Sequence, residues 1–146
     1  MPCIMWAPGR IPAGTTCSEL ATVMDLYPTF AHACGAAIPT DRAIDGKNIC
    51  WLMHSKPGAT TPHEAFYYFV RDGRLAGVRV GRWKLLVDVH TGPWSHDGTV
   101  LYDLETDPGE TENRTQQHAD IVEALEERMQ AFLRDFRQHV REPGRV

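Results

Sequence analysis

Residues 78–87 read VRVGRWKLLV and residues 99–110 read TVLYDLETDPGE, and these two stretches decide the fold. In the first stretch, charged or small residues alternate with the apolar Val78, Val80 and Trp83 before a continuous apolar run begins. Alternation with a period of two is typical of a strand that buries one face. We therefore predict sheet strands in both stretches, with a polar loop between the two stretches.

The same pattern extends to neighbouring segments. Residues 65–70 are aromatic and β-prone, which predicts the first strand of the sheet. Asp72-Gly73 is a strong hairpin signal, so residues 75–80 should run back beside that strand. Residues 83–87 then form the next strand and residues 100–104 the last one. The sheet is expected to contain about four antiparallel strands.

The clearest periodicity lies near the C-terminus, where apolar residues recur at spacings of three and four. They are Ile121, Val122, Leu125, Met129, Phe132, Leu133, Phe136 and Val140. This spacing gives one apolar stripe with charge opposite, typical of a helix laid across a sheet. A dimerising helix is the alternative. We predict an α+β fold: a small antiparallel sheet covered by a long C-terminal amphipathic helix, with an N-terminal strand–helix arm.

The N-terminal arm is predicted from shorter signals. Residues 3–7 form an apolar run before Pro8-Gly9, which indicates a buried strand and a turn. A chain that opens inside a strand leads us to expect a missing part upstream. Asp25 is well placed as the N-cap of a short helix that ends at Gly35. Residues 39–58 are rich in Pro, Gly and Asp without periodicity, which predicts a crossing loop.

Ordered motifs in these segments carry a family resemblance. Residues 79–85 fit Arg-x-Gly-x-Trp-Lys-Leu, and residues 101–113 fit Leu-Tyr-Asp-Leu-x-x-Asp-Pro-Gly-Glu-x-x-Asn. Both strings resemble the C-terminal domain of the formylglycine-dependent sulfatases. Further similarity to that family, in the same order, lies at residues 2–14, 25–30 and 44–48. The resemblance therefore spans nearly the whole chain.

The resemblance implies a division into three parts. Residues 1–38 correspond to an arm derived from the end of the sulfatase catalytic domain, residues 39–64 to a crossing loop, and residues 65–146 to the small C-terminal domain. Proteins of this family are commonly exported or lysosomal. The present chain, however, starts without the charged and apolar regions of a signal peptide.

The family's catalytic chemistry is not matched by this sequence. The resemblance implies a nucleophile made by oxidising a cysteine in a Cys-x-Pro-x-Arg context, beside a divalent cation held by Asp and Asn. None of the four cysteines has that context: Cys3, Cys17, Cys34 and Cys50. The family's paired metal-binding acidic residues and its active-site lysine are also missing. We expect no formylglycine and no sulfate-ester cleavage by the family mechanism; the cysteines are expected to be buried free thiols.

Two polar loops, the first at residues 53–64 and the second at residues 88–97, correspond to segments that project toward the catalytic pocket in the family. The candidate substrate-facing residues on them are His54, Lys56, His63 and Trp94. A third set of polar residues, on the predicted strands, is a candidate anion cradle: Arg79, Arg82 and Lys84. Alternating cations on the outer face of a strand are more often solubility features.

The second loop also offers a possible metal site. Its candidate ligands are Asp88, His90, His96 and Asp97. Two imidazoles and one or two carboxylates suit Zn²⁺ or Mn²⁺, and such an ion lowers the pKa of a bound water toward about 7. The spacing matches no sharp metal motif, and two histidines in a polar loop are more often solvated than ligated.

Length and charge exclude several classes of partner. The 146 residues allow one modest hydrophobic core. A net charge of −4 without a basic patch argues against nucleic acid and against an anionic membrane as partners. No apolar run approaches the roughly 20 residues of a membrane span.

Two functional interpretations follow. The first is a non-catalytic sulfatase C-terminal domain that exposes apolar surface on residues 3–6 and 27–34, so that a homo-oligomer through the N-terminal arm is expected. The second, from a different class, is an independent metal-dependent hydrolase with weak activity on phosphate or sulfate esters. It would use metal-activated water, and removal of the metal or of His90 or His96 should lower its activity.

Overall fold

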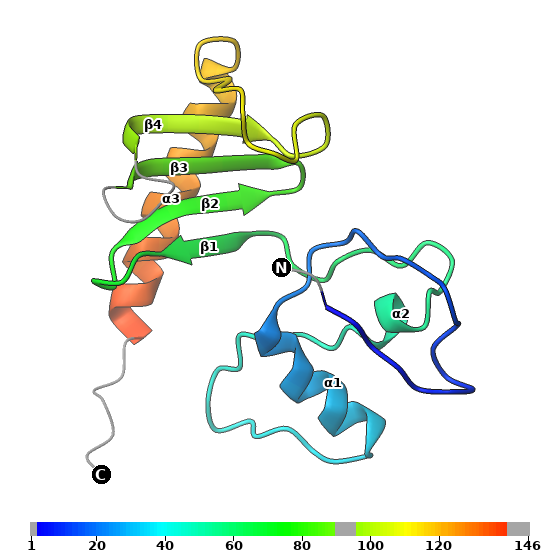
Figure 1. Ribbon diagram of the computed structural model, residues 1–146. Helices are drawn as coiled ribbons and strands as arrows, with labels where there is room; N and C mark the ends of the chain where they lie inside the picture. Colours follow the sequence, from blue (N-terminus) through cyan, green and yellow to red (C-terminus); the bar gives the residue numbers. More distant parts are fainter. Residues whose placement is uncertain (1–2, 90–95, 140–146) are drawn as a thin grey trace. The chain divides into compact units, whose positions relative to one another are not determined.

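The chain divides into two compact units, Met1–Glu64 and Ala65–Val146, named here the N-terminal unit and the C-terminal unit. Figure 1 shows the computed structural model, which describes residues 3–89 and 96–139. The C-terminal unit contains the sheet and the long helix. The N-terminal unit contains short helices joined by long loops.

Four strands form one antiparallel sheet in sequence order. They are β1 (Phe66–Phe69), β2 (Leu75–Val80), β3 (Trp83–Val89) and β4 (His96–Asp103). The predicted number and order of strands are confirmed. The last strand starts at His96 rather than Val100, because backbone pairing resumes between Val89 and His96 beyond an irregularity at Asp88. Side-chain patterning does not reveal such an extension.

The β1–β2 hairpin is closed where the Asp72-Gly73 pair predicts it. The backbone N–H of Val70 donates to the carbonyl of Arg74 at 2.9 Å, and the N–H of Gly73 donates to the carbonyl of Val70 at 2.9 Å. The Asp72 carboxylate accepts the N–H of Arg74 at 2.9 Å. This short turn confirms the predicted reversal between the first two strands.

Helix α3 (Ala119–His139) lies across one face of the sheet, as Figure 1 shows. The register aligns Val78, Leu85 and Leu101 across three strands, so their side chains share that face. All three are fully buried and pack with Leu125 and Met129 of the helix. The apolar stripe of α3 therefore covers the sheet, which confirms the predicted role of the helix and the α+β fold class.

The N-terminal unit contains η1 (Val23–Asp25), α1 (Leu26–Ala33) and α2 (Cys50–Met53). Helix α1 ends at Ala33, and the predicted stop, Gly35, follows it with a φ of 69°, in the left-handed region that glycine tolerates. The N–H of Ala36 donates to the carbonyl of Ala31 at 2.8 Å, and that of Gly35 to His32 at 3.1 Å. These two bonds satisfy carbonyl groups at the end of the helix.

Three expectations for this unit are wrong. Residues 3–7 form no strand, and Ile4 and Trp6 are 96% and 84% exposed, because the described part of the unit contains no strand to pair with them. Only Cys50 of the four cysteines is buried. Helix α2 interrupts the predicted loop of residues 39–58, since four residues are too few to show a helical period.

Candidate functional site

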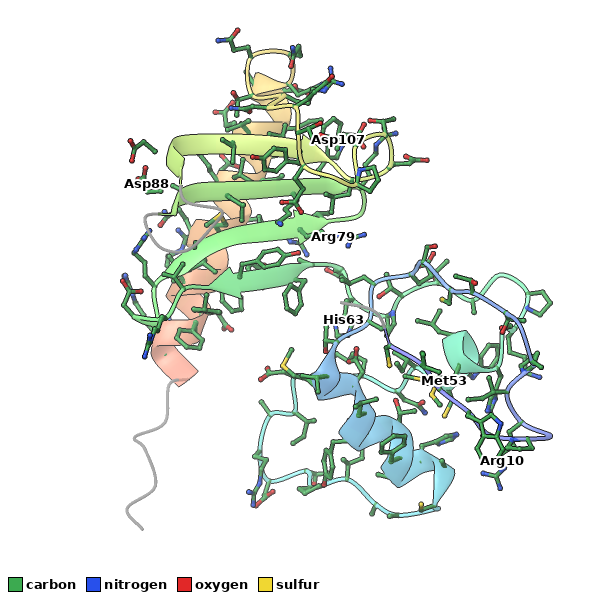
Figure 2. The ribbon with its side chains drawn as sticks, in the orientation of Figure 1. Arg10, Met53, His63, Arg79, Asp88 and Asp107 are labelled. Carbon is green, nitrogen blue, oxygen red and sulfur yellow. The ribbon has the colours of Figure 1, made fainter. Side chains whose placement is uncertain are left out.

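The carboxylates of the motif at residues 101–113 are held by hydrogen bonds within the C-terminal unit. The Asp103 carboxylate accepts from the guanidinium of Arg82, with Nε at 2.6 Å, and from the hydroxyl of Thr106 at 2.9 Å. The Arg82 guanidinium is the main reason that the pKa of Asp103 lies well below its usual value. Asp107, labelled in Figure 2, accepts the N–H groups of Thr111 and Glu112 at 2.7 and 2.8 Å.

The remaining polar residues of the motif tie the loop after β4 to the sheet. Both carboxylate oxygens of Glu110 accept from Nζ of Lys84, at 2.6 and 2.7 Å. Glu110 holds this position with a φ of 56°, which is uncommon outside glycine. The side chain of Asn113 accepts the backbone N–H of Leu101 at 3.2 Å. The most specific motif in the sequence therefore stabilises the fold.

The candidate anion cradle on the strands is largely engaged in these same bonds. Lys84 is paired with Glu110, and Arg82 is paired with Asp103 and with Glu105. Arg79 donates from Nε to the carbonyl of Gly81 at 3.1 Å. Two of the three cations thus already have carboxylate partners, which leaves little positive charge for an external anion.

Only some of the candidate metal ligands lie within the residues that the structure describes. Asp88 has a φ of 45°, and its carboxylate accepts the N–H of Gly98 at 2.8 Å. Asp97 is exposed. His90, Trp94 and the side chain of His96 lie outside the described residues. Within residues 3–89 and 96–139, no group of three or more His, Cys, Asp or Glu side chains is placed to hold a metal ion, and the site stays a prediction.

His63, a candidate substrate-facing residue, is buried against Asp25. Its Nε2 lies 2.7 Å from the Asp25 carboxylate, and the side chains are 8% and 0% exposed. Asp25 also accepts the backbone N–H groups of Thr22 and Lys47, both at 2.7 Å. Burial opposes ionisation of this carboxyl, but the N–H groups and His63 outweigh it, so the pKa of Asp25 is lowered. Figure 2 labels His63 in this unit.

Asp25 therefore differs from its predicted role. It occupies the N-cap position of α1, but its side chain makes no capping bond to that helix. The carboxylate instead joins three separate segments through Thr22, Lys47 and His63. Sequence reasoning missed this role because the partners lie up to 38 residues away.

The other two substrate-facing candidates, His54 and Lys56, line one hollow of about 800 Å³ in the N-terminal unit. Arg10 and His32 line the same hollow, which brings together four side chains able to carry positive charge. Its buried lining includes Thr29. Figure 2 labels Arg10 and Met53, which belong to this lining.

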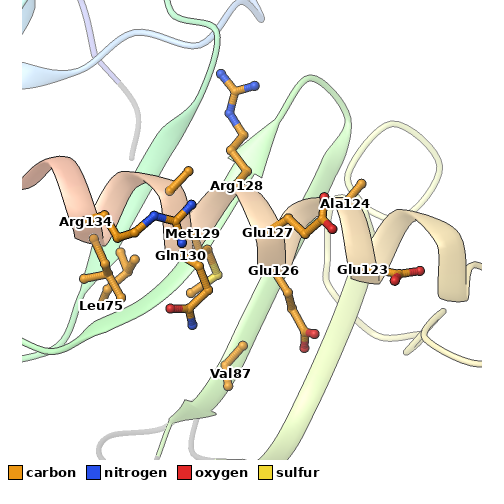
Figure 3. A pocket seen from close by; sticks show the side chains of 12 residues that line it. Leu75, Val87, Glu123, Ala124, Glu126, Glu127, Arg128, Met129, Gln130 and Arg134 are labelled. Atoms are coloured by element: carbon orange, nitrogen blue, oxygen red, sulfur yellow. The ribbon is translucent and has the colours of Figure 1, made fainter.

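A second hollow, of about 1010 Å³, lies along α3 in the C-terminal unit and is shown in Figure 3. Its charged lining residues are Glu123, Glu126, Glu127, Arg128 and Arg134. The carboxylates come from residues 123–127 and the guanidinium groups from Arg128 and Arg134, so the lining carries both signs of charge along the helix. No helix within the described residues is long and apolar enough to span a membrane.

The comparison with known protein families agrees with the motifs and with this fold. A family model described as "N-sulphoglucosamine sulphohydrolase, C-terminal" matches residues 1–135. The chain belongs to this family of sulfatase C-terminal domains. The sheet and helix α3 of the C-terminal unit are thus the architecture of a sulfatase-family domain.

Individual relatives are sulfatases as well. The chain is 39% identical over 93 residues to the N-acetylgalactosamine-6-sulfatase of Canis lupus familiaris, covering 64% of this chain and 17% of that protein. It is 39% identical over 84 residues to an arylsulfatase of Hemicentrotus pulcherrimus, covering 58% and 14%. This sulfatase-family chain thus spans about a sixth of the length of these relatives.

A solved structure agrees in fold. The PsFucS1 sulfatase from Pseudoalteromonas sp. superposes with a TM-score of 0.72 at 18% identity, over 92% of this chain and 30% of that chain. This likeness concerns the fold alone.

Two lining residues of the hollow in this sulfatase-family chain, Arg10 and His32, were not among the sequence candidates. Arg10 follows a Pro-Gly turn and His32 lies in a helix, and neither has a motif around it. Only the folding of residues 4–11 beside α1 and α2 brings them to His54 and Lys56. A search for lone cations in polar loops would have found Arg10 and missed His32.

Proposed function

We propose that this chain is a non-catalytic C-terminal domain of a sulfatase-like protein. In such a protein it closes one wall of the active site and contributes to the choice of substrate, while another part supplies the nucleophile. The observation that carries this proposal is that the polar side chains of the family motif form hydrogen bonds within their own domain. These side chains are Asp103, Asp107, Glu110 and Asn113.

Two further observations support it. No cysteine of the chain is followed by the Pro and Arg that the family nucleophile requires. The relatives named above are sulfatases several times longer than the matched region, so most of their length lies outside it.

The test is a hydrolysis assay on the purified chain. Chromogenic sulfate and phosphate esters are supplied with and without a chelator, and metal content is measured by elemental mass spectrometry. We expect no turnover above that of a heat-denatured sample, because the chain lacks a nucleophile of the family type. Turnover that survives dialysis and scales with protein concentration would overturn the proposal.

The second candidate is a metal-dependent ester hydrolase that acts alone. Asp88 favours it, because a positive φ at a β-irregularity is the kind of local strain that gathers at functional sites. This function requires stoichiometric Zn²⁺ or Mn²⁺ and turnover that a chelator abolishes. His90→Ala and His96→Ala should each lower that turnover, and activity unaffected by all three treatments rules the candidate out.

A further inference from the structure

The loop between strand β4 and helix α3 contains the tripeptide Asn113-Arg114-Thr115. An asparagine followed two positions later by Thr or Ser, with a residue other than proline between them, is the acceptor sequence for N-linked glycosylation. The sequence contains only two asparagines, and the other one, Asn48, is followed by Ile49 and Cys50. The chain therefore has a single Asn-x-Ser/Thr sequence.

The two ends of the Asn113 carboxamide lie in different surroundings. Its Oδ1 accepts the backbone N–H of Leu101 at 3.2 Å and that of Thr115 at 3.0 Å. Two N–H donors require an acceptor, so the oxygen must be the end that faces them. Asn113 is exposed, and within residues 3–89 and 96–139 no hydrogen bond engages its Nδ2. The nitrogen that would carry a glycan is thus the end without a partner.

A glycan on this nitrogen is compatible with the folded loop. Glycosylation replaces one hydrogen of Nδ2 and leaves the carbonyl oxygen of the side chain as an acceptor, so both backbone bonds to Oδ1 can remain. The neighbouring Glu112, Gln116 and Gln117 are exposed as well. A glycan is bulky and hydrophilic and must stay in water after folding, which this part of the loop allows.

The other asparagine shows that a local turn alone does not make such a site. Asn48 Oδ1 accepts the backbone N–H of Cys50 at 2.9 Å, which is the same local arrangement as that of Asn113 with Thr115. Ile49 and Cys50, however, are 3% and 6% exposed, and Cys50 carries a thiol in place of a hydroxyl group. The acceptor sequence and the exposed surroundings occur together only at Asn113.

We propose that Asn113 is a site of N-linked glycosylation when the chain passes through a secretory compartment. The donor is an oligosaccharide linked to a lipid diphosphate. A bond forms between Nδ2 and C1 of the first sugar, while the bond between C1 and the diphosphate oxygen breaks. The lipid diphosphate leaves with the electron pair of that bond, and Nδ2 loses one proton to a base of the transferase. The site does not depend on the proposed function.

Glycan transfer is measured by translating the full chain, preceded by a cleavable signal peptide, in the presence of microsomes. We expect a product of lower gel mobility, which peptide N-glycosidase returns to the mobility of the unmodified chain. That enzyme converts the linked asparagine into aspartate. Peptide mass spectrometry should therefore find the conversion at Asn113 and not at Asn48.

Variants of the hydroxyl residue locate the site without altering Asn113. Thr115→Val keeps the shape of the side chain and the backbone N–H that binds Asn113, but removes the hydroxyl group, so the modification should be lost completely. Thr115→Ser keeps a hydroxyl group and should retain the modification. Thr111→Val is the matched control, because it removes a hydroxyl group of the same loop, one that donates to Asp107 at 3.0 Å, and should also retain it.

The folded state is tested on the chain secreted by a eukaryotic host. The unfolding temperature, followed by circular dichroism, should be no lower for the glycosylated chain than for the unmodified Thr115→Val chain. A lower value would show that the glycan disturbs the bonds to Oδ1 and would contradict the structural basis of the proposal. Absence of modification in the microsomes, modification that survives Thr115→Val, or conversion at Asn48 alone overturns the proposal itself.

Discussion

Asp25 shows how one buried residue organises the N-terminal unit. Its carboxylate is fully buried and accepts two backbone N–H groups and the ring of His63. A buried carboxylate is tolerated only when such donors replace the water that it loses. Because Thr22, Lys47 and His63 come from different segments, the long loops of this unit are held at one point.

Replacing this carboxylate should destabilise the N-terminal unit. Asp25→Asn keeps the shape of the side chain but replaces one acceptor oxygen with an amide N–H₂. At least one donor that now binds Asp25 would then lack an acceptor, so we expect the free energy of unfolding to fall by about 3 kcal/mol. The measurement is urea unfolding at pH 7, followed by tryptophan fluorescence. Asp41→Asn, which removes an exposed carboxylate beside Arg42, is the control and should leave the midpoint unchanged. Equal midpoints for the two variants would contradict this role.

The Asp25 carboxylate also makes the stability of the folded chain fall at low pH. The pKa of Asp25 is lower in the folded chain than its ordinary value of 3.8, so its contribution to stability is complete above that value. The contribution is lost as the pH falls through the folded pKa. Unfolding midpoints measured from pH 6 to pH 2 should therefore fall more for the natural chain than for Asp25→Asn. Parallel curves would show that another group dominates.

Among the elements, strand β2 contains a glycine, Gly77, that is closely surrounded by its neighbours. A Cβ added at Gly77 would lie 2.4 Å from the carbonyl oxygen of Leu85 and 2.6 Å from a methyl group of Leu86. Gly77 faces Leu86 in the ladder, so strand β3 fills the space beside it. From the sequence, Gly77 is only a small residue within a predicted strand, and its close contact with strand β3 could not be predicted.

Gly77→Ala should therefore destabilise the C-terminal unit by about 1–3 kcal/mol, because the added methyl group forces neighbouring strands apart. Gly109→Ala is the matched control, since its nearest neighbour would be a methyl group of Thr111 at an ordinary 3.5 Å. Thermal unfolding followed by circular dichroism compares the two. If Gly77→Ala unfolds at the temperature of the natural chain, the close approach is relieved without cost.

At the scale of the whole molecule, the N-terminal arm exposes unusual apolar surface. Ile4 is 96% exposed and Tyr27 51% exposed, within the residues expected to mediate self-association. Large apolar patches that are exposed on an isolated chain commonly mark a surface that another molecule covers. A homo-oligomer through this arm remains our prediction for the chain by itself.

Sedimentation velocity over a hundredfold range of protein concentration tests that prediction. We expect a dimer or larger species that dissociates on dilution, and the double change Ile4→Ser with Tyr27→Ser should shift it to monomer. Trp51→Ser is the control, because Trp51 is 69% exposed but lies outside residues 1–38. A monomer at every concentration would contradict self-association, and equal effects of both variants would place the interface elsewhere.

The sequence alone determined the four strands, the β1–β2 turn, helix α3 and the sulfatase-family motif at residues 101–113, because these depend on side-chain period and on neighbouring residues. Only the tertiary structure decided how that motif is used, since Glu110 meets Lys84 across 26 residues. It also decided the partners of Asp25 and the grouping of Arg10 and His32 with His54 and Lys56. Such contacts join segments far apart in the chain, and no local pattern encodes them.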